Sequence, residues 1–194
     1  MGNFMATKTP PKPELITASG CMVDLVNPDP ASFMLDDIAV GLAHEGRWAN
    51  QSRPWYSVAQ HCIRVADQLN GRDGNNKLAA AGLMHDAHEF LLRDVGTPFK
   101  AVLSGYVLYA TRMQDAIHRR FGLNPSVGDY AAIAAVDASE THHEAISFMP
   151  ASWTGVTISP RRLAEGTGII PMTAKQAYRV FLDRAKRYGV IQPK

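Results

Sequence analysis

The stretch GLMHDAHEF, residues 82–90, holds four titratable side chains within five positions of an otherwise apolar segment. They are His85, Asp86, His88 and Glu89. The run from Leu78 to Met84 is apolar nearly all round, which predicts a central, buried helix. Buried imidazole and carboxylate groups cost free energy unless they pair with each other or bind a metal ion. The stretch therefore raises the question of what offsets that cost.

The chain around this stretch is predicted to be almost all helix. Apolar periodicity and capping residues predict helices over residues 35–45, 57–71, 76–95, 105–122, 130–148 and 173–189. Ser57 with Gln60, and Thr173 with Gln176, have the spacing of capping boxes. Residues 16–30 predict a short strand or hairpin arm that ends in a proline turn. We predict an all-α, single-domain helical bundle with irregular N-terminal and C-terminal segments, residues 15–194, behind a flexible tail, residues 1–14.

The composition is that of an ordinary soluble globular protein. Of its 194 residues, 46% are hydrophobic and 20% are charged, with a formal charge of +2 and no basic stripe, so no nucleic-acid polymer is expected as partner. Cys21 and Cys62 make no disulfide framework. Residues 1–20 contain no apolar h-region, so we do not expect them to act as a signal peptide, and no apolar run approaches the roughly 18 residues of a membrane span. We expect a cytoplasmic protein with no membrane partner.

Three helices that are predicted to be central, over residues 57–71, 76–95 and 130–148, each contain polar groups at apolar positions. They are His61, the pair His85-Asp86, and Asp137. Two imidazoles and two carboxylates form a mixed nitrogen and oxygen ligand set, which suits a divalent ion such as Mn, Co, Fe, Ni or Zn. One ion would offset the burial cost of all four groups. We therefore predict a metal site that joins distant helices.

Glu89 is placed to act on water near such an ion. It follows His85 by four residues and Asp86 by three, so a continuous helix would present all three on one broad face. A carboxylate one turn beyond the ligands is where a general base or a water-positioning group belongs. The pattern is HDxxE and differs from HExxH, so the other ligands must come from elsewhere in the chain.

Simpler interpretations exist for each residue taken alone. His61 could be a hydrogen-bonded core histidine, and Asp137 could be a buried cap or the partner of Arg93. His88 and the pair His142-His143 are alternative ligands, but supporting or surface roles fit them better. The order of His61, then His85-Asp86, then Asp137 is what favours a metal site.

This order of residues resembles that of the HD-domain metal-dependent phosphohydrolases. The segment MHDAHEFLLRDVGTPFK, residues 84–100, is similar to the HDAxE-x4-D-x2-TPxK segment of bacterial 5'-deoxynucleotidases and phage dATP triphosphohydrolases. DIAVGLAHEGRW, followed by YSVAQH, resembles the N-terminal block of the same branch, as does VDLVNPDP. The resemblance covers roughly residues 19–150, and it implies a helical fold of the HD-domain type.

The resemblance also implies roles for individual residues. His61, His85, Asp86 and Asp137 match the metal ligands, and Glu89 matches the carboxylate that activates or orients the attacking water. The remaining matches lie around them: Asp94 is a second acidic residue near the site, Arg47 and Trp48 contact the sugar-phosphate and base, and Lys100 contacts phosphate. From the residues alone, Trp48 could instead belong to the core, and Asp94 with Lys100 could be a surface pair at a helix end.

The implied activity is metal-dependent hydrolysis of phosphate from a small nucleotide substrate. A deoxynucleoside 5'-monophosphate and a deoxynucleoside triphosphate such as dATP remain equal alternatives. A third possibility is a non-catalytic nucleotide-binding or sensor protein of the same fold. Ala49, Asn50 and Gln51 replace the usual Gly-Gly-His run, and Ala134 replaces a basic group, so base preference and grip on a long polyphosphate stay open. A homo-oligomer is expected because family members assemble.

Overall fold

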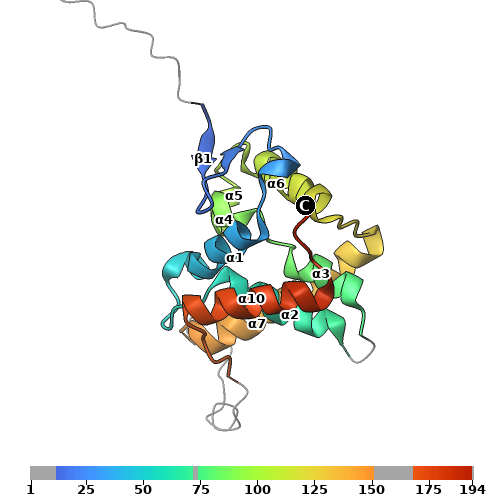
Figure 1. Ribbon diagram of the computed structural model, residues 1–194. Helices are drawn as coiled ribbons and strands as arrows, with labels where there is room; N and C mark the ends of the chain where they lie inside the picture. The colour runs from blue at the N-terminus through green and yellow to red at the C-terminus, as the bar shows by residue number, and fades with distance from the viewer. Residues whose placement is uncertain (1–11, 72–73, 151–167, 194) are drawn as a thin grey trace, which may run out of the picture.

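The computed structural model describes residues 12–71, 74–150 and 168–193, which form a mostly helical fold with one small hairpin (Figure 1). The hairpin pairs β1 (Glu14–Ile16) with β2 (Met22–Asp24) in antiparallel register. The helices are α1 (Leu35–His44), α2 (Val58–Asn70), α3 (Asn76–Leu83), α4 (Glu89–Leu92), α5 (Thr97–Lys100), α6 (Tyr106–Phe121), α7 (Val127–Phe148) and α10 (Ala174–Tyr188). Short 3-10 turns lie at Pro30–Ser32 (η1) and Trp48–Asn50 (η2). The all-α prediction is confirmed for this part of the chain.

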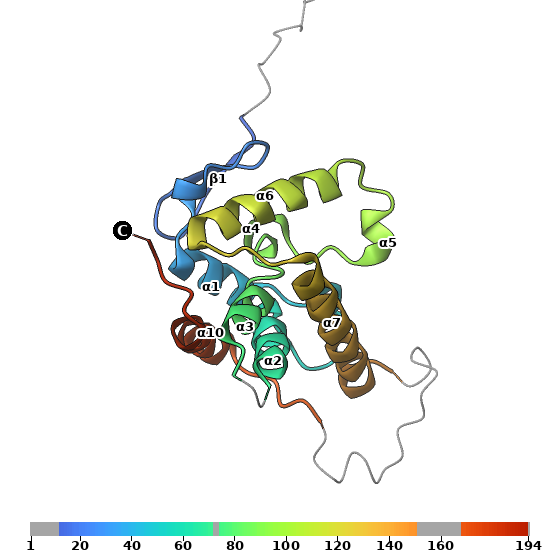
Figure 2. The ribbon, with the colours of Figure 1, turned by 90° about the vertical axis from the view of Figure 1, so that its right-hand side faces the viewer.

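The main core lies where α1, α2, α3 and α10 pack together. Figure 2 shows α2 and α3 between α10 on one side and α7 on the other, and packing contacts join these same helices. The apolar periodicity that predicts a helix over residues 35–45 corresponds to a buried face, since Ile38, Ala39 and Leu42 are fully buried and Leu35 is partly buried. The hairpin also fulfils its prediction, although Glu14, placed in the flexible tail, belongs to β1. Residues 1–11 of that tail lie outside the described residues.

The helix predicted over residues 76–95 is wrong, because the chain leaves the helical path in its middle. α3 ends at Leu83, residues 84–88 form turns, and α4 begins at Glu89. His85 and Asp86 therefore lie in a break between two helices instead of on one helical face. α4 can then approach α1 closely, because Gly41 has no side chain: a Cβ there would lie 2.8 Å from the Cβ of Phe90. The break and this close approach set the position of Glu89.

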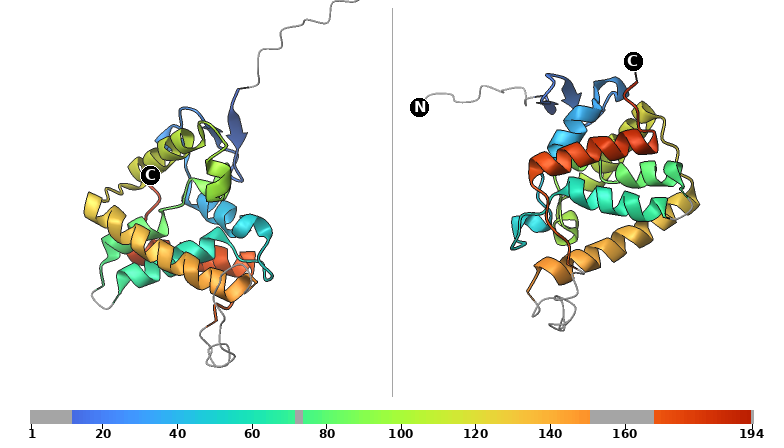
Figure 3. Two further views of the ribbon diagram at one scale, coloured as in Figure 1. Left: turned by 180° about the vertical axis from the view of Figure 1, so that it is seen from behind. Right: turned by 60° about the horizontal axis from the view of Figure 1, so that its bottom comes forward.

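The helix predicted as central over residues 130–148 lies on the outside of the bundle. Figure 3, seen from behind, shows α7 running along the surface. Its buried residues are Ile133, Glu140, Glu144, Ala145 and Phe148, so two of them are glutamates. Most of its alanines face solvent. The apolar composition of this segment reflects alanine, which favours helix without requiring burial.

The capping residues were predicted in part. Thr173 and Gln176 form both halves of the capping box of α10. Ser57 accepts the backbone N–H of Gln60 at the start of α2, but the Gln60 side chain does not return to Ser57. It donates to the carbonyl of Ile170 at 2.8 Å and accepts from the backbone N–H of Met172 at 2.7 Å. Gln60 thus ties the segment before α10 to α2.

Two further observations concern membrane-spanning helices and the cysteines. Within residues 12–71, 74–150 and 168–193, none of the helices is long and apolar enough to cross a membrane. Cys21 and Cys62 are free cysteines, and Cys62 is buried.

Candidate metal centre and substrate pocket

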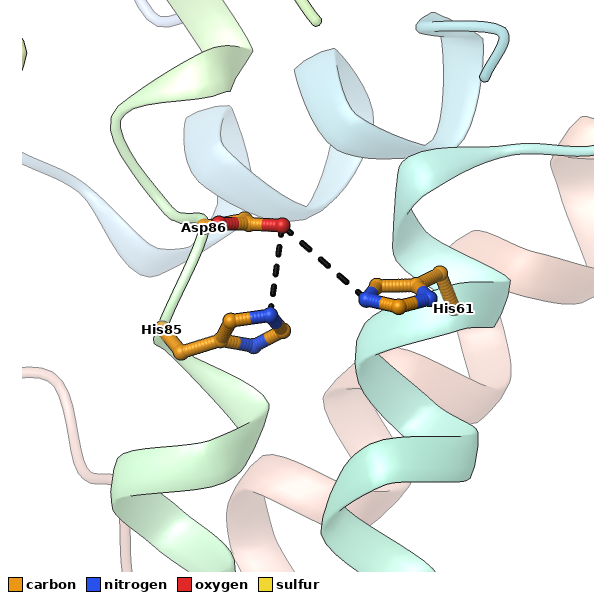
Figure 4. A group of neighbouring side chains, drawn as sticks. All are labelled: His61, His85 and Asp86. Atoms are coloured by element: carbon orange, nitrogen blue, oxygen red, sulfur yellow. Dashed lines mark ion pairs between the residues drawn. The ribbon is translucent and has the colours of Figure 1, made fainter. Parts of the chain in front are cut away.

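Three of the predicted ligands meet between α2 and the break that follows α3. Figure 4 shows the rings of His61 and His85 turned toward the carboxylate of Asp86. The Oδ2 atom of Asp86 lies 3.2 Å from Nε2 of His85 and 4.0 Å from Nε2 of His61. One ligand atom from each residue lies within 4.8 Å of the others, so the group could hold a metal ion.

The fourth predicted ligand comes from α7. Oδ1 of Asp137 lies 3.0 Å from Nε2 of His61 and 3.9 Å from Nε2 of His85. The alternative that Asp137 pairs with Arg93 is wrong, because Arg93 donates to Glu45 with Nη1 and Oε2 2.8 Å apart. Asp137 thus stands beside the group formed by His61, His85 and Asp86.

The hydrogen bonds of the two histidines leave their Nε2 atoms available as ligands. Nδ1 of His85 lies 2.7 Å from the carbonyl oxygen of Gly82, and Nδ1 of His61 lies 2.6 Å from Oε1 of Glu144. Both contacts require a proton on Nδ1, so that in the neutral form of each ring the lone pair lies on Nε2. Both Nε2 atoms are buried and form no hydrogen bond with the described residues. Two convergent imidazole lone pairs and two carboxylates fit a divalent cation.

The electrostatics of the group favour positive charge beside Asp86. Burial by itself would lower the pKa of His85, but the carboxylate of Asp86 raises that pKa well above its ordinary value. Burial opposes charge on Asp86 too, yet His85 holds the pKa of Asp86 well below its usual range. A protonated His85 and a bound cation would each neutralise the negative charge of Asp86. Metal binding is therefore expected to compete with protons.

Glu89 stands next to this group in a poorly solvated position. Its side chain is 2% exposed, and its Oε2 is buried without a hydrogen-bond partner among the described residues. Burial, followed by the charges of Asp86 and Asp94, raises the pKa of Glu89 to about 10. Glu89 thus binds a proton at neutral pH. A cation beside Asp86 would lower the pKa of Glu89 and favour its ionised carboxylate.

A pocket of about 670 Å³ opens directly in front of the group. Asp86, Glu89 and Asp137 line it, which places the two carboxylate ligands and the candidate base on its wall. The predicted substrate-binding residues and the second acid line it too: Arg47, Trp48, Asp94 and Lys100. The volume falls in the range of small-molecule sites. The structure brings together every residue that the sequence predicted for the site.

Arg47 and Trp48 are held by α7. Nε of Arg47 donates to Oε2 of Glu144 at 2.8 Å, and its Nη2 donates to the hydroxyl of Thr141 at 3.0 Å. Nε1 of Trp48 donates to the same Oε2 at 3.2 Å. Trp48, Ala49 and Asn50 have φ values of 60°, 49° and 60°. This left-handed conformation costs roughly 1–2 kcal/mol for each of Trp48 and Ala49, whereas asparagine adopts it more readily.

Asp94 is positioned by a turn that the sequence did not reveal. Arg93 ends α4 with a φ of 72°, and the buried Glu45 accepts from both Arg93 and the backbone N–H of Asp94, the latter at 3.3 Å. Burial raises the pKa of Asp94, although Arg47 opposes the shift. Lys100 lies nearby, with its Nζ 5.7 Å from the ring centroid of Tyr106. The pocket wall thus contains both acidic and basic groups.

The sequence also missed Glu144, which contacts three residues of the site. A signal was available, because seven residues make almost two turns of an α-helix, so Asp137 and Glu144 lie on one face of α7.

His88 and His143, which the sequence offered as alternative ligands, do not belong to the group formed by His61, His85 and Asp86. Nδ1 of His88 is 3.1 Å from Oε1 of Gln114, and the side chain of His143 is 54% exposed.

Comparisons with known proteins identify relatives but no activity. No family model matches the chain. It is 39% identical over 129 residues to the uncharacterized protein RCAP_rcc00048 of Rhodobacter capsulatus, which covers 63% of this chain and 65% of that protein. It is 28% identical over 161 residues to the uncharacterized protein YfdR of Escherichia coli, covering 83% and 86% of the two chains. The chain spans just under two thirds of the first relative's length, and neither name states what the protein does.

Proposed function

We propose that the protein is a metal-dependent phosphohydrolase of the HD-domain type that releases phosphate from a deoxynucleotide. One observation supports this above all. The buried Nε2 atoms of His61 and His85 form no hydrogen bond with the described residues and converge on Asp86, with Asp137 beside them. The pocket in front of them contains Arg47 and Lys100, which attract phosphate. The order of the four ligand residues resembles that of the family.

The ligand residues would hold the cation, and the neighbouring residues would direct the substrate. When bound, a divalent cation supplies Lewis acidity toward a phosphoryl oxygen and makes a nearby water more acidic. His61 and His85 would bind through Nε2, because their Nδ1 protons are already donated to Glu144 and Gly82. Asp86 and Asp137 would neutralise the charge of the cation.

Glu89 would take up or orient the proton of the attacking water. Its buried carboxyl lies on the pocket wall beside Asp86, which is the place from which a water near the ligands can be reached. A base in this role must be ionised. Because the charge of Asp86 is one cause of the raised pKa of Glu89, neutralising Asp86 would lower that pKa toward the working range.

The remaining wall of the pocket would bind the nucleotide. Lys100 and the Nη atoms of Arg47 would stabilise charge on the phosphate oxygens, and Trp48 offers an aromatic face for a base or sugar. A pocket of about 670 Å³ accommodates a monophosphate as well as a triphosphate, so both substrates remain in the proposal. The expected homo-oligomer stays a prediction. The exposed Phe99, Val102, Leu103, Val107 and Leu108 offer an apolar surface for it.

Phosphate release from a panel of nucleotides tests this function. We expect purified protein, stripped with a chelator and then supplied with Mn, Co, Fe, Ni or Zn, to hydrolyse deoxynucleoside monophosphates or triphosphates only in the presence of metal. Inorganic phosphate is measured by colorimetry, and the nucleoside products are separated by chromatography. Phosphate release from the monophosphates and phosphate release from the triphosphates are measured separately, which identifies the substrate class. Protein that binds metal and nucleotide but releases nothing from the panel would instead be a sensor of the same fold.

A further inference from the structure

Glu144 connects two parts of the site that have different tasks. It lies on α7 and is completely buried. Its Oε1 accepts from Nδ1 of His61 at 2.6 Å, and its Oε2 accepts from Nε of Arg47 at 2.8 Å and from Nε1 of Trp48 at 3.2 Å. One carboxylate thus bonds a candidate metal ligand through one oxygen and two residues of the pocket wall through the other.

We propose that Glu144 is a positioning residue that couples metal binding to the geometry of the substrate-binding wall. This inference rests on the proposed function, because it assigns His61 to the metal and Arg47 with Trp48 to the substrate. Through Oε1, Glu144 keeps the proton of His61 on Nδ1 and turns Nε2 toward Asp86. Through Oε2, it fixes the guanidinium and the indole at the edge of the pocket. Glu144 itself touches neither metal nor substrate.

The chemistry of three donors requires a carboxylate at this position. His61, Arg47 and Trp48 each present an N–H, and a carboxylate accepts through both oxygens. A glutamine has a single acceptor oxygen, and its NH₂ group would face a donor whichever way the amide points. If the amide oxygen faces His61, the NH₂ meets Arg47 and Trp48. If the oxygen faces Arg47, the NH₂ meets His61 and favours the tautomer whose Nε2 is protonated, which cannot bind metal.

Glu140 provides a matched control for this substitution. It lies on α7 one turn before Glu144 and is also completely buried. Its carboxylate accepts from Arg64, at 2.5 Å, and from Gln68, neither of which contacts the metal centre or the pocket. Glu140→Gln therefore changes a buried glutamate of the same helix without changing the site. A purely structural role for Glu144 predicts similar behaviour for both variants.

The test compares Glu144→Gln with Glu140→Gln in a W55F/W153F background, in which Trp48 is the only tryptophan. Zinc affinity is measured by competition with a chelator, Trp48 emission by fluorescence, and KM and kcat by phosphate release at saturating metal. We expect Glu144→Gln to weaken zinc binding about 10- to 100-fold, as loss of a partner of a metal-ligating histidine does elsewhere. We also expect shifted Trp48 emission and a raised KM. Glu140→Gln should change none of these quantities.

The outcomes separate this inference from the proposed function. Wild-type zinc affinity and Trp48 emission in Glu144→Gln would overturn the coupling while leaving the phosphohydrolase proposal in place. Failure of the wild-type protein to bind any of Mn, Co, Fe, Ni and Zn would overturn both. If Glu144→Gln does not fold, NMR of the zinc-loaded wild-type protein decides. The Nδ1 proton of His61 and the Nε1 proton of Trp48 should both exchange slowly with solvent, and fast exchange of either would overturn the inference.

Discussion

Replacing Asp86 with alanine is expected to abolish metal binding and, with it, phosphate release. Asp86 is the ligand at the centre of the group: its Oδ2 lies 3.2 Å from Nε2 of His85 and 4.0 Å from Nε2 of His61. Its charge is the main reason that the pKa of His85 is raised against the effect of burial. Without that charge, Asp137 is the one carboxylate left in the proposed ligand set, and a single carboxylate does not offset the desolvation of a divalent cation between two imidazoles. The metal content of dialysed protein measures the effect.

The matched control for this variant is Asp183→Ala. Asp183 lies on α10, its side chain is 69% exposed, and its recorded ion pair is with the neighbouring Arg184. Removing it changes the protein charge by the same amount without touching the centre. We expect Asp183→Ala to bind metal and to turn over like the wild-type protein. An Asp86→Ala protein that still binds one ion per chain would show that the ligand set proposed here is wrong.

Replacing Glu89 with glutamine should keep the metal but reduce kcat by about 100-fold or more, the range of general-base contributions. Glu89 belongs to the pocket wall and does not complete the ligand group, so metal affinity should change little. Glutamine preserves the volume of this buried side chain while removing its capacity to accept a proton. The measurement is single-turnover phosphate release at saturating metal. Full activity in this variant would exclude Glu89 as the base.

The same substitution should stabilise the metal-free protein at high pH. The ordinary pKa of a glutamate is 4.5, and burial raises the pKa of Glu89 in the folded protein to about 10. Between these pH values the carboxyl of Glu89 is protonated in the folded state and ionised in the unfolded state. The contribution of Glu89 to the free energy of unfolding is therefore full below pH 4.5 and is lost as the pH rises toward 10. The limiting slope is about 1.4 kcal/mol per pH unit. Denaturation in chelator should show a gain for Glu89→Gln that grows from pH 5 to pH 8.

The helices with clear caps and one apolar face were predictable from local sequence. The C-termini of α1, α6 and α10 lie close to the predicted residues. For α6 and α10 the signal was a glycine, because Gly122 and Gly189 adopt the left-handed conformation that ends each helix. The break at residues 84–88 was not predictable from periodicity, because the stretch keeps helical spacing although it forms turns. Long-range contacts override local preference there, such as the donation of Gln114 to the carbonyl of Met84 at 2.6 Å.

The ligand residues of the candidate site were predictable from the sequence, but the residues that hold the site in place were not. His61, His85, Asp86 and Asp137 could be found because acids and histidines at apolar positions are unusual. Glu45 and Glu144 were missed because a glutamate on an amphipathic helix is ordinary in sequence, and only tertiary contacts reveal that both are buried. The capping role assigned to Gln60 was half wrong for the same reason, since its amide bonds a segment 110 residues away.

The placement of α7 on the outside of the bundle has a consequence for folding. With few buried apolar residues, this helix gains little free energy from packing, yet it contributes Asp137 to the centre. A cation shared by Asp137, His61 and His85 would act as a crosslink between α7 and the core. By mass action, such a ligand raises the free energy of unfolding by RT ln(1 + [M]/Kd). The supply of metal would then govern the resistance of this helix to local unfolding, independently of any turnover.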